Sequence, residues 1–468
     1  MENFDNLILD TDSYKTSHFK QYDPAVTEAS SYIEPRKGDE ITFFGPQMYT
    51  KRYLSKPLTI ADIDEAESYI VPHGTPFNRA GWVRIVSKHD GWLPLEISSL
   101  PEGTVHGAGI PQVQIRTLDP EFVWLGSYIE TALLRATWYP SSVASISRGI
   151  KKDIKHYLEL TADDPVRELP FKLHDFGARG VSSKESAGIG GIAHLVNFKG
   201  TDTLEALRYG RRYYSEHMAG FSIPAAEHST ITSWGREGEL DAFRNMLTAF
   251  PDSPIIAVVS DTYNIFRACD DLWGGVLKGK VQALGTRGRT LVIRPDSGDP
   301  RETLMRVFEI LFDRFREDCT TNSKGYRLLP PYLRVIQGDG VNAKSIVEIL
   351  EAMKNKGYSA SNIVFGMGGA LLQKVDRDTY SYAMKLNEVV KDGKSVPVFK
   401  DPITDSGKSS KKGRQAVVAS PVSGKLTAIP EAALGVTKLP NLLTPLWSKG
   451  KLLRDDTLST IRARAEVA

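Results

Sequence analysis

Between His174 and Gly369, short apolar stretches run repeatedly into clusters of charged, polar or glycine residues. In chain order the clusters are HDFGARG (174–180), NFKGTD (197–202), PAAEHS (224–229), VVSD (258–261), VIRPDSG (292–298), VIQGDG (335–340) and FGMGG (365–369). Imidazole, carboxylate and guanidinium groups can activate nucleophiles, bind phosphates and stabilise charge that develops during a reaction. Their recurrence predicts an enzyme active site assembled from many segments of the chain.

Two pairs of ionisable residues in these clusters could act together. Arg294 and Asp296 are two residues apart, so in a continuing strand both side chains point to the same side. The arginine could then contact a phosphate or diphosphate, and the aspartate could bind sugar hydroxyls or a metal. A structural ion pair is the alternative. His228 and Asp261 could form an oriented imidazole that acts as a nucleophile or diphosphate ligand, although a lone histidine is usually structural.

The remaining clusters offer groups for recognition. Phe176 could stack on a flat heterocycle beside Arg179, or it could be a core residue. Asp202 could accept a hydrogen bond from a substrate amide, or it could cap the following helix. The glycines of VIQGDG and FGMGG could let backbone N–H groups approach a phosphate, or they could merely allow tight turns. GIGG (188–191) lacks the spacing of a dinucleotide site and is interpreted as close helix packing.

The spacing of the clusters indicates how the chain positions them. Successive clusters are 26 to 43 residues apart when counted at Phe176, Asp202, His228, Asp261, Asp296, Asp339 and Gly368. A strand with its crossover helix needs roughly 30 residues or more. Apolar runs at 255–259 and 333–336 are typical of buried parallel strands, and apolar spacing over 304–315 and 346–353 predicts helices. We therefore expect an α/β fold with a (β/α) barrel over residues 166–400, whose strand-end loops gather on one face.

Three further regions are expected outside the barrel. Residues 1–120 are predicted to form a β-rich flanking domain. Its expected elements are a short helix at 60–70 and strands at 82–86, 94–98 and 113–117. Residues 121–165 are predicted to form two linking helices interrupted near Pro140, because proline breaks the helical hydrogen-bond ladder. Residues 401–468 are predicted to hold a basic loop and a C-terminal segment, β-like at 418–429, that packs back on the β-rich domain.

Composition excludes several classes of function. The 468 residues carry 59 basic and 57 acidic side chains, and this balance favours neither nucleic-acid nor membrane-surface binding. Anionic small substrates remain compatible, because they need only local basic groups. Two cysteines are too few for a disulfide framework and fit a reducing cytoplasm; Cys269 is expected to be buried. The N-terminus lacks a secretory pattern, and no apolar run approaches the roughly 20 residues of a membrane span. We expect a cytoplasmic protein.

Taken in order, nine motifs resemble those of the nicotinamide phosphoribosyltransferase family. They are LDTDSYKTSHFKQY, HDFGARGVSS, LVNFKGTDT, PAAEHSTIT, VVSDTYN, VIRPDSG, PPYLRVIQGDGV, FGMGGALLQK and FKDP…SKKGR. The resemblance runs from about residue 8 to about residue 415. The wider type II superfamily also contains nicotinate and quinolinate phosphoribosyltransferases, and it implies an irregular barrel with a β-rich flanking domain.

The resemblance also implies an activity. Family members transfer the phosphoribosyl group of phosphoribosyl diphosphate to nicotinamide, which gives nicotinamide mononucleotide and diphosphate in NAD salvage. It implies Mg²⁺, held mainly by the diphosphate, and ATP as a coupled co-substrate that phosphorylates the histidine matching His228, with Asp261 orienting the ring. It further implies a homodimer with active sites shared between subunits.

Residue by residue, the resemblance implies a role for each motif. The pyridine ring would be bound by Phe176, Asp202 and Tyr14, with Tyr14 contributed by the other subunit. The diphosphate would be bound by Arg179, His228 and Arg294. The ribose and its phosphate would be bound by Arg294, Asp296, Gly338, Asp339, Gly368, Gly369 and Arg377. Accessory basic positions would be Arg36, Lys385, Lys400 and Lys408. Among these, His228, Asp261, Arg294 and Asp296 are the expected catalytic residues.

Three residues depart from the family pattern, and other functions must be weighed. Ala178, Ala257 and Met367 replace the residues expected there and suggest a changed pocket shape. The nearest alternative is a nicotinate phosphoribosyltransferase, which Asp202 disfavours because an aspartate repels a carboxylate. A phosphate-binding aldolase or isomerase would need a lysine or carboxylate base at a strand end, and no barrel cluster supplies an inward lysine. A non-catalytic ligand-binding protein is disfavoured because the matched polar positions are intact.

Overall fold

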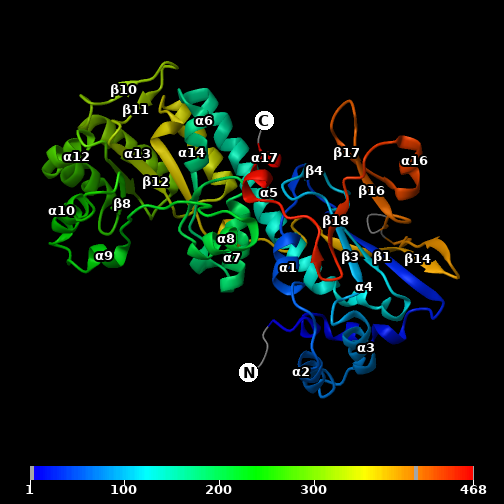
Figure 1. The fold of residues 1–468 in the computed structure, drawn as a ribbon. Helices are drawn as coiled ribbons and strands as arrows, with labels where there is room; N and C mark the ends of the chain where they lie inside the picture. Colours follow the sequence, from blue (N-terminus) through cyan, green and yellow to red (C-terminus); the bar gives the residue numbers. More distant parts are fainter. Residues whose placement is uncertain (1–4, 405–408, 467–468) are drawn as a thin grey trace. The chain divides into compact units, whose positions relative to one another are not determined.

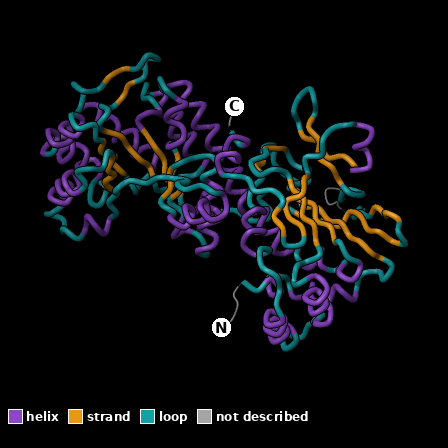
Figure 2. The backbone as a smooth tube through the Cα atoms, in the orientation of Figure 1, coloured by secondary structure: helices purple, strands orange, loops and turns teal. Residues whose placement is uncertain are grey.

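The computed structural model describes residues 5–404 and 409–466. The chain divides into two compact units (Figures 1 and 2). The first, called here the β unit, comprises Met1–Ser145, Arg212–Glu216 and Val375–Glu466. The second, the barrel unit, comprises Ile146–Arg211, His217–Lys374 and two terminal residues outside the described range.

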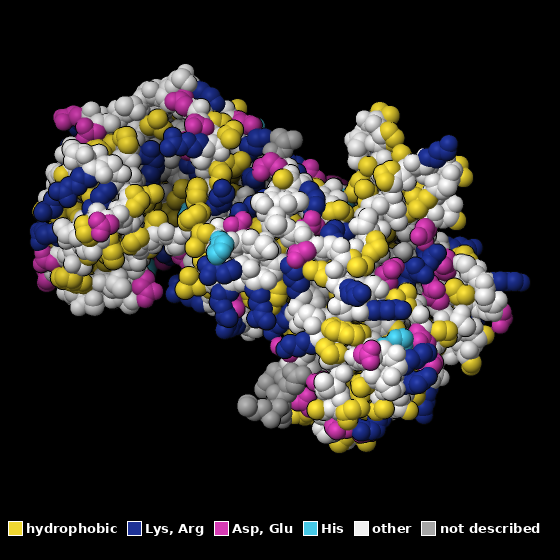
Figure 3. Space-filling model, viewed as in Figure 1, with side chains coloured by type: hydrophobic (Ala, Val, Ile, Leu, Met, Phe, Trp, Pro, Cys, Tyr) yellow, Lys and Arg dark blue, Asp and Glu magenta, His cyan; other side chains and the backbone are white. Residues whose placement is uncertain are grey.

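On the face drawn in Figure 3, acidic and basic side chains both occur across the surface. No helix in the described part of the chain is long and apolar enough to cross a membrane.

The β unit is built on a seven-stranded antiparallel sheet. In spatial order its strands are β15 (Lys394–Pro397), β14 (Ala383–Lys391), β1 (Val26–Glu34), β5 (Val113–Thr117), β3 (Leu95–Ser99), β18 (Thr444–Ser448) and β19 (Lys451–Leu452). The predicted strands at 94–98 and 113–117 are therefore confirmed. A smaller hairpin, β16 (Gln415–Ala419) with β17 (Leu426–Pro430), confirms the β-like pattern expected at 418–429.

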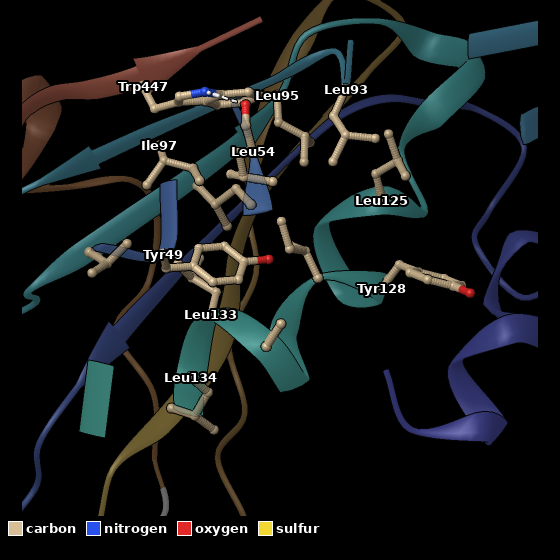
Figure 4. Close-up of a cluster of buried hydrophobic side chains, with 14 of the residues drawn as sticks. Tyr49, Leu54, Leu93, Leu95, Ile97, Leu125, Tyr128, Leu133, Leu134 and Trp447 are labelled. Atoms are coloured by element: carbon tan, nitrogen blue, oxygen red, sulfur yellow. Dashed lines mark hydrogen bonds between the residues drawn. The ribbon is translucent and has the colours of Figure 1, made fainter. Parts of the chain in front are cut away.

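A large apolar core lies against this sheet, and Figure 4 shows part of it. Trp447 of β18 donates a hydrogen bond from its indole N–H to the carbonyl of Leu54 at 3.2 Å, so the polar atom of this buried ring is satisfied. The core is also contacted by α1 (Pro46–Tyr53), α2 (Ile60–Ile70) and α3 (Arg79–His89). The helix expected at 60–70 is confirmed as α2. Thr59 and Asp62 form a capping box at its N-terminus.

Residues 82–86 were expected to be a strand, and that prediction is wrong, because they lie within α3. The side chains of Trp82 and Ile85, three positions apart, are both buried, as on one face of a helix. Asn78 caps the helix by accepting a hydrogen bond from the N–H of Gly81, and Asp90 ends it in the left-handed conformation. An apolar pattern over only five residues is compatible with both a strand and a helix. Only the capping residues at the ends of the segment distinguish the two.

The expected break near Pro140 is also wrong, because α5 (Glu130–Thr161) is one helix that contains this proline. The proline ring packs against Gly45, where an added Cβ would stand 2.3 Å from the ring. Next to it, the Ser141 hydroxyl accepts from the N–H of Phe44 and donates to its carbonyl, both at 3.0 Å. Pro140 has no backbone N–H and cannot donate a helical hydrogen bond. Packing against Phe44 and Gly45 therefore stabilises the helix at this position. From Ile146 onward α5 belongs to the barrel unit.

Parallel strands form the barrel unit, as predicted. In spatial order they are β7 (Gly200–Thr201), β6 (Leu173–Asp175), β13 (Ile363–Met367), β12 (Leu333–Gln337), β9 (Thr290–Arg294) and β8 (Ile255–Val259). The extended segment 221–226 bridges the two edge strands. Phe221 exchanges backbone hydrogen bonds with Lys199 and Thr201 on one side, and Ala257 exchanges them with Pro224 and Ala226 on the other. The strands and this segment close an irregular α/β barrel.

Helices follow the strands and cover the barrel (Figure 1). They include α7 (Lys184–His194), α8 (Leu204–Tyr214), α9 (His228–Thr232), α10 (Glu239–Ala249), α12 (Lys278–Gly285), α13 (Pro300–Arg314), α14 (Ala343–Asn355) and α15 (Gly369–Leu372). The predicted apolar stripes of α13 and α14 are buried, and so is Cys269. The close-packing interpretation of GIGG is confirmed in α7, where a Cβ added at Gly188 would stand 2.4 Å from the Tyr209 ring of α8.

Candidate active site

Six of the sequence-predicted clusters meet at the carboxyl ends of the barrel strands, and one of them, NFKGTD, ends with Asp202 directly after β7. Asp175 ends β6 and is followed by Phe176; Arg294 ends β9 and is followed by the Pro295–Gly298 turn. VIQGDG and FGMGG follow β12 and β13, which lie between β6 and β9 in the sheet. VVSD follows β8, the neighbour of β9. Because parallel strands present their carboxyl ends at one edge, these loops share one face of the barrel.

A cavity of about 780 Å³ occupies the barrel interior beneath these loops. Phe176, Asp202, Ser222 and Arg294 line it at the carboxyl ends of the strands. Deeper lining residues are Ala257, Val292, Ile336 and Val364, and the other end is lined by Lys172, Arg334, Glu168 and Asp164. Of the three departures from the family pattern, Ala257 lines this cavity, Met367 is buried at the end of β13, and Ala178 is exposed.

Two glycines make room for the Phe176 ring. A Cβ added at Gly366 would stand 2.0 Å from Phe176 Cε2, and one at Gly338 would stand 3.2 Å from the same atom. The Arg294 guanidinium lies 5.4 Å from the ring centroid, within the range of a cation–π contact. Phe176 is thus fixed at the cavity wall with a cation beside it. Gly338 was expected to admit a phosphate; here its missing side chain makes space for Phe176 and Arg294. Gly366 was not singled out from the sequence.

Asp202 lies in the loop after β7, and its carboxylate is held by Ser222. The Ser222 hydroxyl donates to Asp202 Oδ1 at 2.5 Å, and the Asp202 backbone N–H donates to the carbonyl of Asp175 at 2.9 Å. Ser222 belongs to the segment that closes the barrel, 20 residues from Asp202 in the chain. Sequence reasoning missed it, because an isolated serine outside the recognised motifs carries no signal.

His228, Asp261 and Asp296 form one hydrogen-bonded constellation. Nε2 of His228 lies 2.9 Å from Asp261 Oδ1, while Nδ1 lies 3.9 Å from Asp296 Oδ2. Asp261 Oδ2 accepts from the N–H of Asp296 at 3.0 Å and from the Ser297 hydroxyl at 2.5 Å. The Asp261 side chain is 3% exposed, whereas that of His228 is 45% exposed. A buried carboxylate therefore orients an accessible imidazole, as predicted.

Arg294 and Asp296 form the ion pair that their spacing allowed. Nε and Nη2 of Arg294 donate to Asp296 Oδ1 at 3.0 and 2.6 Å. Since both side chains are only about one fifth exposed, this pair is partly shielded from water. Arg179 is 86% exposed and lies 3.8 Å from Glu227, the residue before His228.

The glycine-containing loops after β6 and β13 also touch one another. A Cβ added at Gly180 would stand 3.3 Å from the backbone nitrogen of Gly369. Gly368 caps α15, and Gly369 is its first residue. The VIQGDG turn is held by Gln337, whose side-chain amide donates to the carbonyl of Asp339 at 2.8 Å, while Asp339 itself is exposed. Gln337 is a second residue that the sequence did not single out.

The remaining predicted site residues lie in the β unit. Lys385 is half-buried, and its pKa is lowered by burial and by the positive charges of Arg36, Lys400 and Arg377. Three of the basic positions expected from the resemblance are therefore close enough to Lys385 to act on its charge. Tyr14 is 59% exposed on a short helix, Ser13–Lys20. Lys408 lies outside the described residues.

Solved structures with a similar fold define the class. Over 99% of this chain and 96% of the other, the fold resembles nicotinate-nucleotide pyrophosphorylase from Pyrococcus furiosus, with a TM-score of 0.62 and 16% identity. It also resembles human nicotinic acid phosphoribosyltransferase, with a TM-score of 0.55 and 16% identity over 97% and 92% of the two chains. The barrel and β unit together have the type II phosphoribosyltransferase fold.

Sequence comparisons identify the family. A model of the nicotinate phosphoribosyltransferase (NAPRTase) family matches residues 171–432, and one of the nicotinamide phosphoribosyltransferase N-terminal domain matches residues 6–97. The chain is 48% identical over 473 residues to a nicotinamide phosphoribosyltransferase of Xanthomonas campestris pv. campestris, covering 100% of both. It is 29% identical over 495 residues to one of Acinetobacter baylyi, covering 98% of this chain and 97% of the other. The chain belongs to the nicotinamide phosphoribosyltransferase family.

Proposed function

We propose that this protein transfers the phosphoribosyl group of phosphoribosyl diphosphate to nicotinamide, releasing diphosphate and nicotinamide mononucleotide for NAD salvage. The observation that carries this proposal is the pairing of Phe176 and Asp202 on the wall of one cavity. An aromatic ring stacks on pyridine, and a carboxylate accepts a hydrogen bond from a carboxamide N–H. The same carboxylate repels nicotinate, so the amide is favoured over the acid.

The barrel residues supply the electrostatics of the transfer. The pyridine nitrogen of nicotinamide is a weak nucleophile, so the bond from ribose C1 to the diphosphate oxygen loosens before the new C–N bond forms. Asp296 stabilises the positive charge that grows on the ribose, and Arg294 and Arg179 stabilise the negative charge on the departing diphosphate. Phe176 and Asp202 hold the ring nitrogen in line with C1, which reduces the entropic part of the barrier.

The donor set fits magnesium that arrives with the diphosphate. Among the described residues, no group of three or more His, Cys, Asp or Glu side chains is placed to hold a metal ion. Mg²⁺ commonly binds through one or two carboxylates together with substrate phosphates. Asp296 and the exposed Asp339 follow the neighbouring strands β9 and β12 and would be these carboxylates. When bound, the ion neutralises charge on the diphosphate.

ATP coupling through a phosphohistidine is supported by the orientation of His228. An ionised Asp261 only accepts hydrogen bonds, so Nε2 carries the proton and Nδ1 presents its lone pair. Nδ1 attacks the γ-phosphorus of ATP, the bond from that phosphorus to the bridging oxygen breaks, and ADP leaves with the electron pair. Asp261 then stabilises the positive charge of the phosphorylated ring, until water attacks phosphorus and releases phosphate.

A homodimer completes the proposed site. Phe176 covers one face of the pyridine, and the resemblance to the family assigns the other face to the equivalent of Tyr14 in the second subunit. The exposure of the Tyr14 ring, 59%, suits a residue that contacts another chain. Arg36, Lys385, Lys400 and Arg377 would bind phosphate groups from the β unit.

Turnover of nicotinamide and nicotinate, each with phosphoribosyl diphosphate and Mg²⁺, tests the proposal. We expect nicotinamide to be preferred and nicotinamide mononucleotide to appear in equal amount to diphosphate. A preference for nicotinate would contradict the proposal and support the alternative, a nicotinate phosphoribosyltransferase.

A further inference from the structure

Asp175 lies behind the cavity wall, on the outer side of the barrel. Along β6 the side chains alternate, so His174 and Phe176 line the cavity and Asp175 points to the opposite side. The Asp175 side chain is fully buried under α7. Gly191 of α7 allows this contact, because a Cβ there would stand 3.1 Å from Asp175 Oδ2.

The two carboxylate oxygens of Asp175 bind different loops. Oδ1 accepts from the backbone N–H of Gly177 at 2.7 Å, in the loop that begins with Phe176. Oδ2 accepts from the Thr201 hydroxyl at 3.2 Å, directly before Asp202. The backbone carbonyl of Asp175 accepts from the N–H of Asp202 at 2.9 Å. Asp175 therefore joins the loop with the stacking ring to the loop with the carboxamide acceptor.

The choice of a carboxylate at this position needs an explanation. Burial raises the pKa of Asp175, because a low-dielectric site disfavours the charged form. A buried carboxylate lowers stability unless hydrogen bonds compensate for lost water. A serine or threonine would bring only one oxygen in place of the two that bond Gly177 and Thr201 separately. Two hydrogen-bonding atoms on one rigid group, one for each loop, are what Gly177 and Thr201 require.

We propose that Asp175 is a positioning residue that fixes the separation between the Phe176 ring and the Asp202 carboxylate, and thereby sets affinity and selectivity for a pyridine carboxamide. This inference rests on the proposed function, which assigns both groups to nicotinamide. The phosphoribosyl contacts come from the loops after β9, β12 and β13. Loss of Asp175 therefore affects the pyridine more than phosphoribosyl diphosphate.

Steady-state kinetics of the full-length enzyme test this role. We expect Asp175→Ala to raise the KM for nicotinamide about tenfold or more, because small misplacements of binding groups have large kinetic effects. The KM for phosphoribosyl diphosphate should change less than about twofold, and turnover of nicotinate relative to nicotinamide should rise. Asp175→Asn should restore most of the affinity, because its amide oxygen accepts from Gly177 and its NH₂ donates to Thr201.

A milder variant guards against loss of folding. Thr201→Val removes one of the two bonds and should raise the nicotinamide KM less, and it should add little to Asp175→Ala in the double variant. Asn362 is the matched control. It is buried at the amino end of β13, away from the carboxyl ends of the strands, and forms hydrogen bonds with Leu329, Arg327 and Ser359. Asn362→Ala should lower the Tm and leave both KM values unchanged.

The positioning role is overturned if Asp175→Ala and Thr201→Val lower the Tm without raising the nicotinamide KM. It is also overturned if Asp175→Asn is as impaired as Asp175→Ala. A wild-type enzyme that prefers another pyridine would instead contradict the proposed function. The KM for that preferred pyridine, compared with the KM for phosphoribosyl diphosphate, would then decide the role of Asp175.

Discussion

Nδ1 of His228 faces Oδ2 of Asp296 at 3.9 Å, while the other nitrogen of the ring is bound to Asp261. The open edge of the imidazole is therefore turned towards the carboxylate that we assign to the ribose. A phosphoryl group on Nδ1 would bring negative charge next to Asp296, so a cation must lie between them. Arg294, which donates to Asp296, is one such cation, and diphosphate-bound magnesium is another. The constellation would thus connect the proposed use of ATP to the part of the site that we assign to the ribose.

Phosphorylation of His228 can be measured directly. Incubation with ATP should label the wild-type protein with an acid-labile phosphate, and His228→Ala should abolish both the label and ATP stimulation. Asp261→Asn should reduce labelling strongly, because the ring loses its orienting carboxylate. Mass spectrometry checks the modified residue. His156→Ala, at an exposed position of α5 in the barrel unit, is the control and should label normally. Labelling that survives His228→Ala would contradict the assignment.

Replacing Asp202 should change pyridine selectivity. Asp202→Asn replaces a charge-assisted hydrogen bond, worth roughly 1.5–3 kcal/mol, by a neutral one worth roughly 0.5–1.5 kcal/mol, so the KM for nicotinamide should rise severalfold. The repulsion of nicotinate should fall at the same time. Ser222→Ala should act in the same direction but more weakly, because it releases Oδ1 of Asp202 without removing the acceptor. Asp241→Asn, exposed on α10, is the control. Unchanged selectivity in Asp202→Asn would exclude Asp202 from carboxamide recognition.

Gly366 should be essential for pyridine stacking. Gly366→Ala places a methyl group 2.0 Å from Phe176 Cε2, so the ring must move from the cavity wall. We expect the KM for nicotinamide to rise by about 10²-fold, since such misplacement is costly. Gly279→Ala in α12 is the matched control, because nothing lies within 4 Å of an added Cβ there. This control should keep activity and stabilise the helix by roughly 0.5–1 kcal/mol. Normal nicotinamide affinity in Gly366→Ala would show that Phe176 is not the stacking ring.

The two-subunit site can be tested by complementation. Tyr14→Ala and Asp202→Asn homodimers should both be impaired, because each damages every site. In mixed dimers, one site would receive both defects and the other neither. Co-expression should therefore restore activity to about one quarter of wild type for random pairing, as measured per active protein. Failure to complement would place Tyr14 and Asp202 in the same site of one subunit, or Tyr14 outside the site.

Glu102 predicts a pH-dependent stability in the β unit. Burial raises its pKa from 4.5 to about 7, while the N–H of Gln47, the hydroxyl of Tyr214 and the charge of Arg454 favour the ionised form. The folded protein binds this proton more tightly than the unfolded chain, so the contribution of Glu102 to stability is fully present below pH 4.5 and is lost as the pH rises to about 7. The loss is at most about 3 kcal/mol.

The Glu102→Gln variant isolates this effect. His106 titrates with the opposite sign: burial lowers its pKa from 6.5 to about 4, so its contribution is lost as the pH falls through that range. Subtracting the Tm of wild type from that of Glu102→Gln at each pH removes the His106 contribution. The difference should grow in favour of the variant from pH 4.5 to 7 and then level. A difference independent of pH would show that Glu102 does not titrate in this range.

The strand-end clusters were predictable because chemistry and secondary structure coincide there. An apolar run predicts a buried strand, and the charged residue at its end, such as Arg294 or Asp261, marks the loop that follows. Ser222 and Gly366 escaped notice for different physical reasons. Ser222 acts through a partner 20 residues away. The importance of Gly366 depends on where the Phe176 ring lies in space, and spacing along the chain does not encode it.

The two errors in secondary structure also have local causes. The alternation of apolar and polar residues at 82–86 is compatible with a strand. The signal for a helix, the N-cap residue Asn78, lies outside this stretch. Pro140 was expected to interrupt the helix, yet the helix continues through it, and Gly45, distant in sequence, packs against its ring. A tertiary contact overrode local preference at Pro140, whereas at 82–86 a neighbouring cap decided between two local patterns. The assignment of roles to Arg179, Asp339 and the basic residues of the β unit came from the resemblance alone.

The segment 221–226 is the seam of the barrel. It is held to each edge strand by one pair of backbone hydrogen bonds, whereas β8 and β9 pair along five residues. This seam carries Ser222, and the histidine proposed to receive phosphate follows it by only a few residues. The segment that carries Ser222, proposed to support recognition of the amide, is thus bound to its neighbours by fewer backbone hydrogen bonds than β8 is to β9. Transient opening of the segment 221–226 would therefore displace Ser222 and the loop of His228 while the hydrogen bonds between the barrel strands stay formed.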